Sequence, residues 1–92
     1  MEHAALLAAL LELAQELGLE VRRIGATATD GLAPAASGTV RLRGRVLVML
    51  FAGDPPERQA DVLARALRAH AGDALEMRFL PPAIRAWLER GA

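Results

Sequence analysis

The hydrophobic pattern is clearest in the segment TVRLRGRVLVMLF, residues 39–51. Over residues 40–43 apolar side chains alternate with arginines, the period of two that marks a strand with one buried face. Gly44 supplies the positive φ that a tight hairpin needs. Residues 46–51 are then apolar at every position, which is typical of a strand covered on both faces. We therefore predict a hairpin whose second strand lies inside a sheet, with helices or a partner subunit over it. The arginine-bearing strand should lie nearer an edge.

The N-terminal segment predicts a helix over residues 1–17, because leucines recur there at helical spacing with Glu12 and Glu16 on the other side. Gly18 is expected to end this helix. Alternation over residues 19–24 then predicts a short strand. The apolar start is not expected to be a signal peptide or a membrane span, since it lacks a basic beginning, contains acidic residues and is too short.

Residues 25–38 show no periodicity and are rich in Gly, Ala, Pro and Thr, with a turn signal at Asp30-Gly31. A loop of this length is uncommon in so small a domain. We expect a flexible connector, and the alternative is a loop that binds a ligand or acts as a lid.

The sequence DPPE at residues 54–57 is a helix-start signal. Asp54 is expected to cap the helix and Glu57 to complete a capping box, with a proline at the first helical position. The helix should end before Gly72, and Asp61 and Arg65 form a favourable i,i+4 pair. The stripe expected to be buried consists of Val62, Leu63, Ala66, Leu67 and His70.

Alternating residues over 74–80 predict a short strand, with a continued helix as the alternative. Pro81 and Pro82 then start a last helix, in which Ile84, Trp87 and Leu88 share one face. These patterns predict a single small α+β domain over residues 1–92. Its order is α-β-β-β-α-(short β)-α, with a mostly antiparallel sheet covered by helices. The residues considered for a subunit interface are Phe51, Trp87 and Leu88, although Trp87 fits the core better.

Composition adds limits to this picture. The 92 residues make one domain that buries only about 60–65% of its unfolded surface, so oligomerisation would help it. The chain is 53% hydrophobic and has equal numbers of basic and acidic residues. Net neutrality predicts no global attraction to nucleic acid or to an anionic membrane. With no cysteine, neither a disulfide nor a thiol nucleophile is available. The chain has no lysine, so its basic residues other than histidine are all arginine, and alanine is abundant. This composition leads us to expect a bacterial cytoplasmic protein.

Residues that could carry chemistry are few. The histidines are His3 and His70, and Asp73 near His70 supplies only a second possible ligand. Two ligands without a third make no zinc site, and we expect no metal and no cofactor. Ser37, the sole serine, lacks the surroundings of a nucleophile elbow. No glycine spacing typical of a nucleotide-binding loop occurs in residues 25–38.

One family resemblance is visible. LAQELGLEVR at residues 13–22, the hairpin, and PPER followed by LARALRA at residues 63–69 resemble the layout of the ImmA/IrrE family of small zinc metallopeptidases. FLP at residues 79–81 resembles that family's downstream LLMP. The resemblance implies a helix that carries LAHELGH, with two histidine ligands and a glutamate that activates water. Arg65, Ala66 and Ala69 stand at those three positions, so it implies a relative without the zinc site or its activity.

Arginines cluster around the predicted hairpin, and they suggest a second hypothesis about the function of the protein. Arg41 and Arg43 are expected to share one strand face, and Arg45, Arg22 and Arg23 to lie nearby. Basic ribbons of this kind can follow phosphates, although edge-strand arginines also prevent aggregation. We expect a non-catalytic protein-interaction or regulatory module that forms a homodimer or binds another protein. The alternatives are nucleic-acid binding through these arginines, and a hydrolase.

The hydrolase alternative requires an acid–base pair, such as Asp30 with Asp54 or with Asp61. Sequence spacing does not favour either pair, because a turn, a helix cap and a surface ion pair explain the three carboxylates equally well.

Overall fold

The β2–β3 hairpin forms around Arg43 and Gly44, as the alternation predicts. In the computed structural model, which describes residues 2–25 and 37–90, strand β2 (Gly38–Leu42) runs antiparallel to strand β3 (Arg45–Phe51). The turn residues have φ of +53° and +78°. Positive φ at both central positions defines a type I′ turn, whose twist matches the two strands.

Strand β1 (Glu20–Ile24) pairs with β3 in parallel, so β3 is the central strand in the order β1-β3-β2. The sheet is therefore mixed, with one parallel and one antiparallel pair, and the expectation of a mostly antiparallel sheet is corrected. Gly38, which the sequence prediction placed in the loop at residues 25–38, belongs to β2. Most of that loop, including Asp30, lies outside the described residues.

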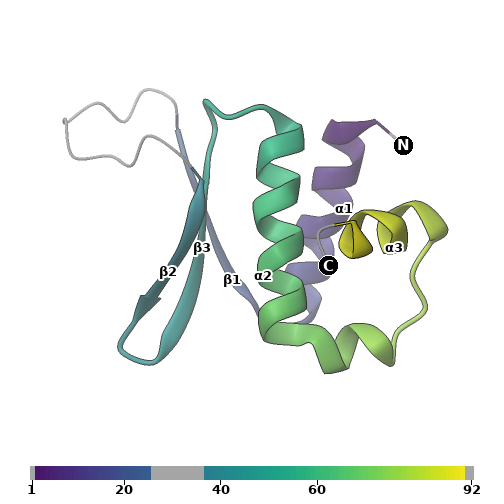
Figure 1. Cartoon of the computed structure of the whole chain (residues 1–92). Helices are drawn as coiled ribbons and strands as arrows, with labels where there is room; N and C mark the ends of the chain where they lie inside the picture. The colour runs from purple at the N-terminus through teal and green to yellow at the C-terminus, as the bar shows by residue number, and fades with distance from the viewer. Residues whose placement is uncertain (1, 26–36, 91–92) are drawn as a thin grey trace.

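The helices are α1 (His3–Glu16), α2 (Pro56–Glu76) and α3 (Pro82–Glu89). Figure 1 shows α1 and α2 along one side of the sheet and α3 on the far side of these two helices. The chain is thus a small α+β domain in the order α-β-β-β-α-α. The expected fold class is confirmed.

The core lies between the sheet and the helices α1 and α2. Its fully buried large side chains are Leu10, Val48, Leu50, Leu63 and Leu67. Each such side chain contributes about 1.5–3 kcal/mol of hydrophobic stabilisation. The described residues of α1 end in a Schellman motif, in which Gly18 (φ +80°) and Leu19 donate backbone N–H groups to Gln15 and Ala14. The predicted role of Gly18 is confirmed.

Helix α2 departs from the sequence prediction at both ends. Pro55, not Asp54, is the N-cap, and no side chain caps the helix. At the other end the helix continues past Gly72, with a kink at Ala71 (φ −137°, ψ 23°). The predicted strand over residues 74–80 is therefore wrong. A strand there would need a pairing neighbour, and α3 and the helix pair occupy this end of the molecule (Figure 1).

The apolar residues that alternate over 74–80 do not share one buried face. Leu75 and Leu80 are buried in the core, whereas Met77 and Phe79 are 90% and 88% exposed. Helix α3 buries Ile84 and Leu88 as expected, and Trp87 is half-buried against the core. The Trp87 ring lies 5.4 Å from that of His3 and carries the Arg90 guanidinium at 4.0 Å. His70, expected in the buried stripe, is exposed.

Candidate functional site

Among residues 2–25 and 37–90, no helix lies over one face of the sheet. Val48 and Leu50 of β3 point into the helical core, so the alternate residues of β3 point to the opposite side. The pairing register assigns residues of β1 and β2 to the same side. We call this side the open face. It consists of Glu20, Arg22, Ile24, Gly38, Val40, Leu42, Arg45, Leu47, Met49 and Phe51.

The middle of the open face is apolar. Leu47, Met49 and Phe51 of β3 are only half-buried, and Val40 and Leu42 are 38% and 55% exposed. Figure 1 shows the three helices on the other side of the sheet. The prediction that β3 lies inside a sheet is confirmed, but among the described elements helices cover only one of its two faces. The described residues therefore do not supply the cover that the sequence pattern predicts for the second apolar face.

The hairpin end of the open face is charged. The Arg45 guanidinium donates to a carboxylate oxygen of Glu20, and Arg22 lies 4.0 Å from the other oxygen of the same group. Together with Arg43, Leu42 and Leu47, these residues line a hollow of about 310 Å³. All of these charged side chains are solvent-accessible, so each ion pair contributes no more than about 1 kcal/mol.

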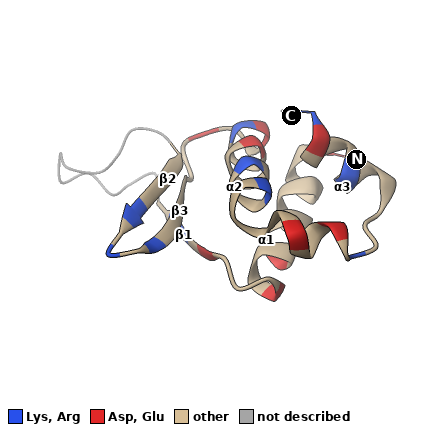
Figure 2. Cartoon of the chain, turned by 60° about the horizontal axis from the view of Figure 1, so that its bottom comes forward, with Lys and Arg blue, Asp and Glu red and all other residues tan. Residues whose placement is uncertain are grey.

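The five arginines of the predicted ribbon do not form one surface. Arg22, Arg43 and Arg45 meet around the hollow, whereas the register places Arg41 opposite Val46 and Arg23 opposite Leu50, on the helix side. The expectation that Arg41 and Arg43 share a face is wrong, because the turn places Arg43 beside the open-face residues. Figure 2 shows basic residues on the hairpin and further ones along α2 and at α3.

The other end of the sheet is held by a polar network around Ser37. The backbone N–H of Ser37 donates to Asp54 Oδ2 and the backbone N–H of Phe51 donates to Ser37 Oγ, each at 2.8 Å. Hydrogen bonds from the backbone N–H and then the hydroxyl of Ser37 lower the pKa of Asp54 from its ordinary value. Gln59 Nε2 donates to the Asp54 carbonyl oxygen at 2.8 Å. The network joins the start of β2, the end of β3 and the start of α2.

This network explains two residues that the sequence presented differently. Asp54 binds Ser37 instead of capping α2, and Ser37, the sole serine, is buried as a structural link between strands. Next to it, a Cβ on Gly53 would lie 2.4 Å from the ring of Phe51. The Phe51 ring therefore packs directly against Gly53. This contact holds the ring at the end of the open face.

The other candidate residues lie apart from this face. Asp61 pairs with Arg65 at 3.5 Å, as the i,i+4 spacing predicts. Of the three positions compared with the zinc helix, Arg65 and Ala69 are exposed and Ala66 is buried. Within residues 2–25 and 37–90, no three His, Cys, Asp or Glu side chains come close enough to hold a metal ion. Asp30, the proposed acid–base partner of Asp54 or Asp61, lies outside these residues.

Comparisons with family models, with curated proteins and with solved structures gave no match. In the described part of the chain, no helix combines the length and the apolar character needed to cross a membrane. Sequence reasoning named Phe51 and two arginines of the open face, Arg22 and Arg45, and it missed Glu20, Ile24 and Met49 as surface residues. The pattern that could have indicated them is the run of residues 46–51, which is apolar on both faces. Such a strand needs an element packed on each face, either from its own chain or from a partner.

Proposed function

We propose that this protein is a non-catalytic interaction module that forms a homodimer by stacking the open faces of two copies. The observation that supports the proposal is the apolar face of β3 that the described helices leave uncovered. Two sheets that stack about 10 Å apart bury such faces against each other, as in β-sandwiches. A second copy would then provide the missing cover of Leu47, Met49 and Phe51.

The positions of the charges favour an antiparallel arrangement. Arg43 and Arg45 outnumber Glu20 at the hairpin end, so stacking two hairpin ends would bring like charges together. A two-fold axis across the strands avoids this, because it places each hairpin end over the Phe51 end of the other copy. Such an isologous contact repeats every pairing twice.

The register of the sheet makes the open face complementary to itself in this arrangement. Glu20 is level with Leu47, and Arg22 is level with Met49 one row further along. A two-fold axis between these rows brings Glu20 of each copy over the partner's Arg22, and Leu47 over the partner's Met49. It also places Val40 opposite the partner's Gly38, where a side chain meets a residue that has none.

The area of the open face determines how tightly the two copies are expected to associate. The strands hold five, five and seven residues, and at about 3.3 Å per residue and about 4.8 Å between strands the footprint is roughly 270 Å² per copy. Stable interfaces bury about 1,200 Å² or more of total accessible surface. We therefore expect a dimer that dissociates on dilution rather than a permanent one.

The test is sedimentation equilibrium over a wide concentration range. Glu20→Arg and Arg22→Glu are each expected to weaken dimerisation about five- to thirtyfold, because each repels a like charge at two symmetric contacts. The double variant should restore association. Arg65→Glu, on the exposed face of α2, is the matched control and should leave the dissociation constant unchanged.

Two results would contradict this proposal. One is a monomer at every concentration. The other is a double variant that associates no better than the single ones while its far-ultraviolet circular dichroism matches that of the wild type.

A second candidate function is nucleic-acid binding, favoured by the meeting of Arg22, Arg43 and Arg45 around one hollow. Glu20 pairs with two of these arginines, which reduces their attraction for phosphate. Fluorescence anisotropy with a labelled single-stranded oligonucleotide tests this candidate. Binding that depends strongly on salt and is lost in Arg43→Glu would favour it over the dimer.

A further inference from the structure

Strand β1 forms one edge of the sheet, since the strand order is β1-β3-β2. Figure 2 shows β1 at the edge nearer to α1 and β2 at the opposite edge. None of the described strands pairs with the outer side of β1. An edge strand of this kind presents backbone N–H and C=O groups to which another extended chain can pair.

The pairing with β3 determines which residues of β1 turn their backbone outward. The Ile24 carbonyl oxygen accepts the backbone N–H of Ala52 at 2.8 Å, so the backbone groups of Ile24 point toward β3. Because backbone groups alternate in direction along a strand, those of Arg22 also point toward β3. The N–H and C=O groups of Val21 and Arg23 therefore point to the outer edge.

A hollow of about 420 Å³ lies beside this edge, between β1 and α1. Its apolar wall consists of Leu11, Leu19 and Val21, which are half-buried against the core. Its polar groups come from Gln15 and Arg23. No described residue of β3 or α2 lines the hollow, so it lies on the outer side of β1. Two residues of β1 thus supply both outward backbone groups and side chains to the same place.

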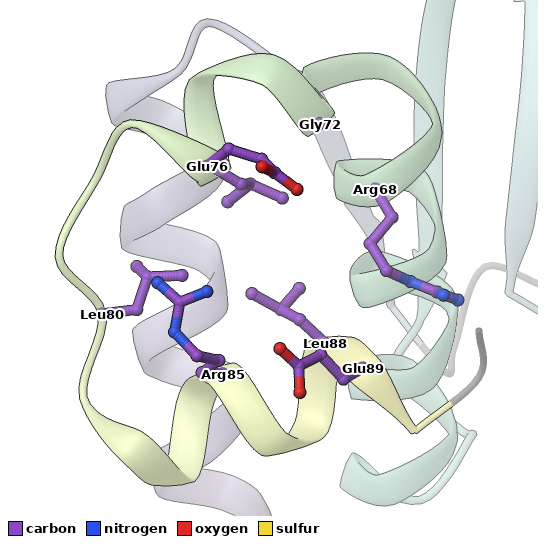
Figure 3. Close-up of a pocket in the computed structure, with 8 residues that line it drawn as sticks. Arg68, Gly72, Glu76, Leu80, Arg85, Leu88 and Glu89 are labelled. Carbon is purple, nitrogen blue, oxygen red and sulfur yellow. The ribbon is translucent and has the colours of Figure 1, made fainter.

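A second cavity, of about 260 Å³, lies between α2 and α3 and differs in this respect (Figure 3). The described residues that line it belong to these two helices and to the segment between them. Figure 3 shows the Arg68 guanidinium pointing away from this cavity. Because the interior backbone groups of a helix bond to one another, an extended chain finds few backbone partners there. The hollow beside β1 is therefore better suited to a peptide.

The charge beside this hollow indicates what kind of peptide fits. Among the described residues, no carboxylate lies within 4.0 Å of the Arg23 guanidinium. An acidic residue directly opposite Arg23 on an added strand would provide one, and such cross-strand pairs are favourable. An aliphatic residue opposite Val21 would contact Leu11 and Leu19, because side chains at this position point to the helix side of the sheet.

We propose that the outer edge of β1 binds an extended peptide segment of another protein, in which an acidic residue is followed two positions later by an aliphatic residue. The segment pairs antiparallel with β1 and exchanges two backbone hydrogen bonds with each of Arg23 and Val21. Its acidic side chain pairs with the Arg23 guanidinium, and its aliphatic side chain fills the hollow. In an antiparallel pair the residue opposite Arg23 precedes the residue opposite Val21, which sets the order of the two side chains.

This proposal does not depend on the homodimer. Stacking of two copies uses side chains of the open face, whereas the peptide uses outward backbone groups of β1 and a hollow on the helix side of the sheet. Sedimentation measures the first and peptide titration measures the second, so either proposal can fail without the other.

The experiment is a titration of the ¹⁵N-labelled protein with the acetylated and amidated pentapeptide Thr-Glu-Thr-Val-Thr, followed by chemical shifts. We expect the amides of Val21 and Arg23 to shift, with a dissociation constant of about 1 mM or below. The same peptide with an N-methylated valine lacks the donor to the Val21 carbonyl oxygen. It should bind about tenfold more weakly or worse, because that buried acceptor loses its partner.

The variants assign the charge. Arg23→Glu should weaken binding of this peptide about fivefold or more, and it should favour a peptide in which lysine replaces the glutamate. Arg41→Glu is the matched control, because Arg41 lies on the helix side of the opposite edge strand, and it should bind the glutamate peptide as the wild type does. The N-methylated peptide keeps the test informative if Arg23→Glu does not fold.

Three results would overturn the proposal. One is the absence of shift changes in β1 at about 10 mM peptide. Another is equal binding by the parent and N-methylated peptides. The third is self-association that excess peptide reverses in sedimentation, which would assign the edge of β1 to a second copy of this chain.

Discussion

Replacing Ser37 with alanine removes the hydroxyl group that links the end of β3 to the start of β2. Ser37 is 7% exposed, and its Oγ accepts the backbone N–H of Phe51 at 2.8 Å. Its own backbone N–H, which donates to Asp54, is unaffected by the substitution. The variant therefore leaves the N–H of Phe51 without its acceptor, and it also removes the hydrogen bond of the Ser37 hydroxyl to Asp54.

The loss of stability can be estimated from the unpaired N–H group of Phe51. An ordinary intramolecular hydrogen bond contributes about 0.5–1.5 kcal/mol, and a buried donor left without a partner costs about 1–3 kcal/mol. We expect Ser37→Ala to lower the free energy of unfolding by about 1–3 kcal/mol. In a domain of this length each kcal/mol corresponds to about 4–8 °C, so the melting temperature should fall by roughly 5–20 °C.

Urea unfolding, followed by Trp87 fluorescence and by far-ultraviolet circular dichroism, measures this change. Ser37→Thr keeps the hydroxyl and is the control, expected to retain most of the stability. If Ser37→Ala were within about 0.5 kcal/mol of the wild type, the loss would be no larger than that of an ordinary surface substitution. The assigned role of the Ser37 hydroxyl would then be wrong.

Two further predictions concern the same sheet. The pKa of Asp54 is lowered in the folded protein because Ser37 donates hydrogen bonds to its carboxylate. Asp54 therefore stabilises the fold at a pH above its unfolded-state pKa of about 3.9, and this stabilisation is lost as the pH falls through its folded-state pKa. Asp54→Asn should therefore remove part of the loss of stability on acidification, measured by urea unfolding between about pH 6 and pH 2; an unchanged pH dependence would contradict this. Arg43 has φ +53°, and Asn tolerates this conformation better. Arg43→Asn should raise the free energy of unfolding by about 0.5–1 kcal/mol. A melting temperature no higher than that of the wild type would show that the backbone of Arg43 is not strained in the turn.

Local sequence signals were sufficient for several parts of the fold. The two-residue turn at Arg43-Gly44, the end of α1 at Gly18 and the Asp61–Arg65 pair were all correctly predicted. Each depends on groups only a few residues apart, so the chain around them supplies the whole physical cause. The buried positions of α1 and most of those of α2 follow from helical periodicity for the same reason.

Local signals were misleading where a second element decided the outcome. Asp54 fits a helix cap, but Ser37, seventeen residues earlier, binds its carboxylate instead. Residues 74–80 alternate as a strand does, but none of the described strands lies beside them, and α2 continues to Glu76. Hydrogen-bond partners that are distant in the sequence are not visible in a local pattern.

The sequence by itself determined that β3 is apolar on both sides and that arginines lie on both sides of its hairpin turn. Only the tertiary structure decided that β1 lies parallel beside β3, which brings Glu20 to Arg45 and places Arg22 one row further along. It also decided which face the helices α1 and α2 cover. The physical reason is that a period of two specifies which residues share a face, but it does not specify the neighbouring strand or the element that covers that face.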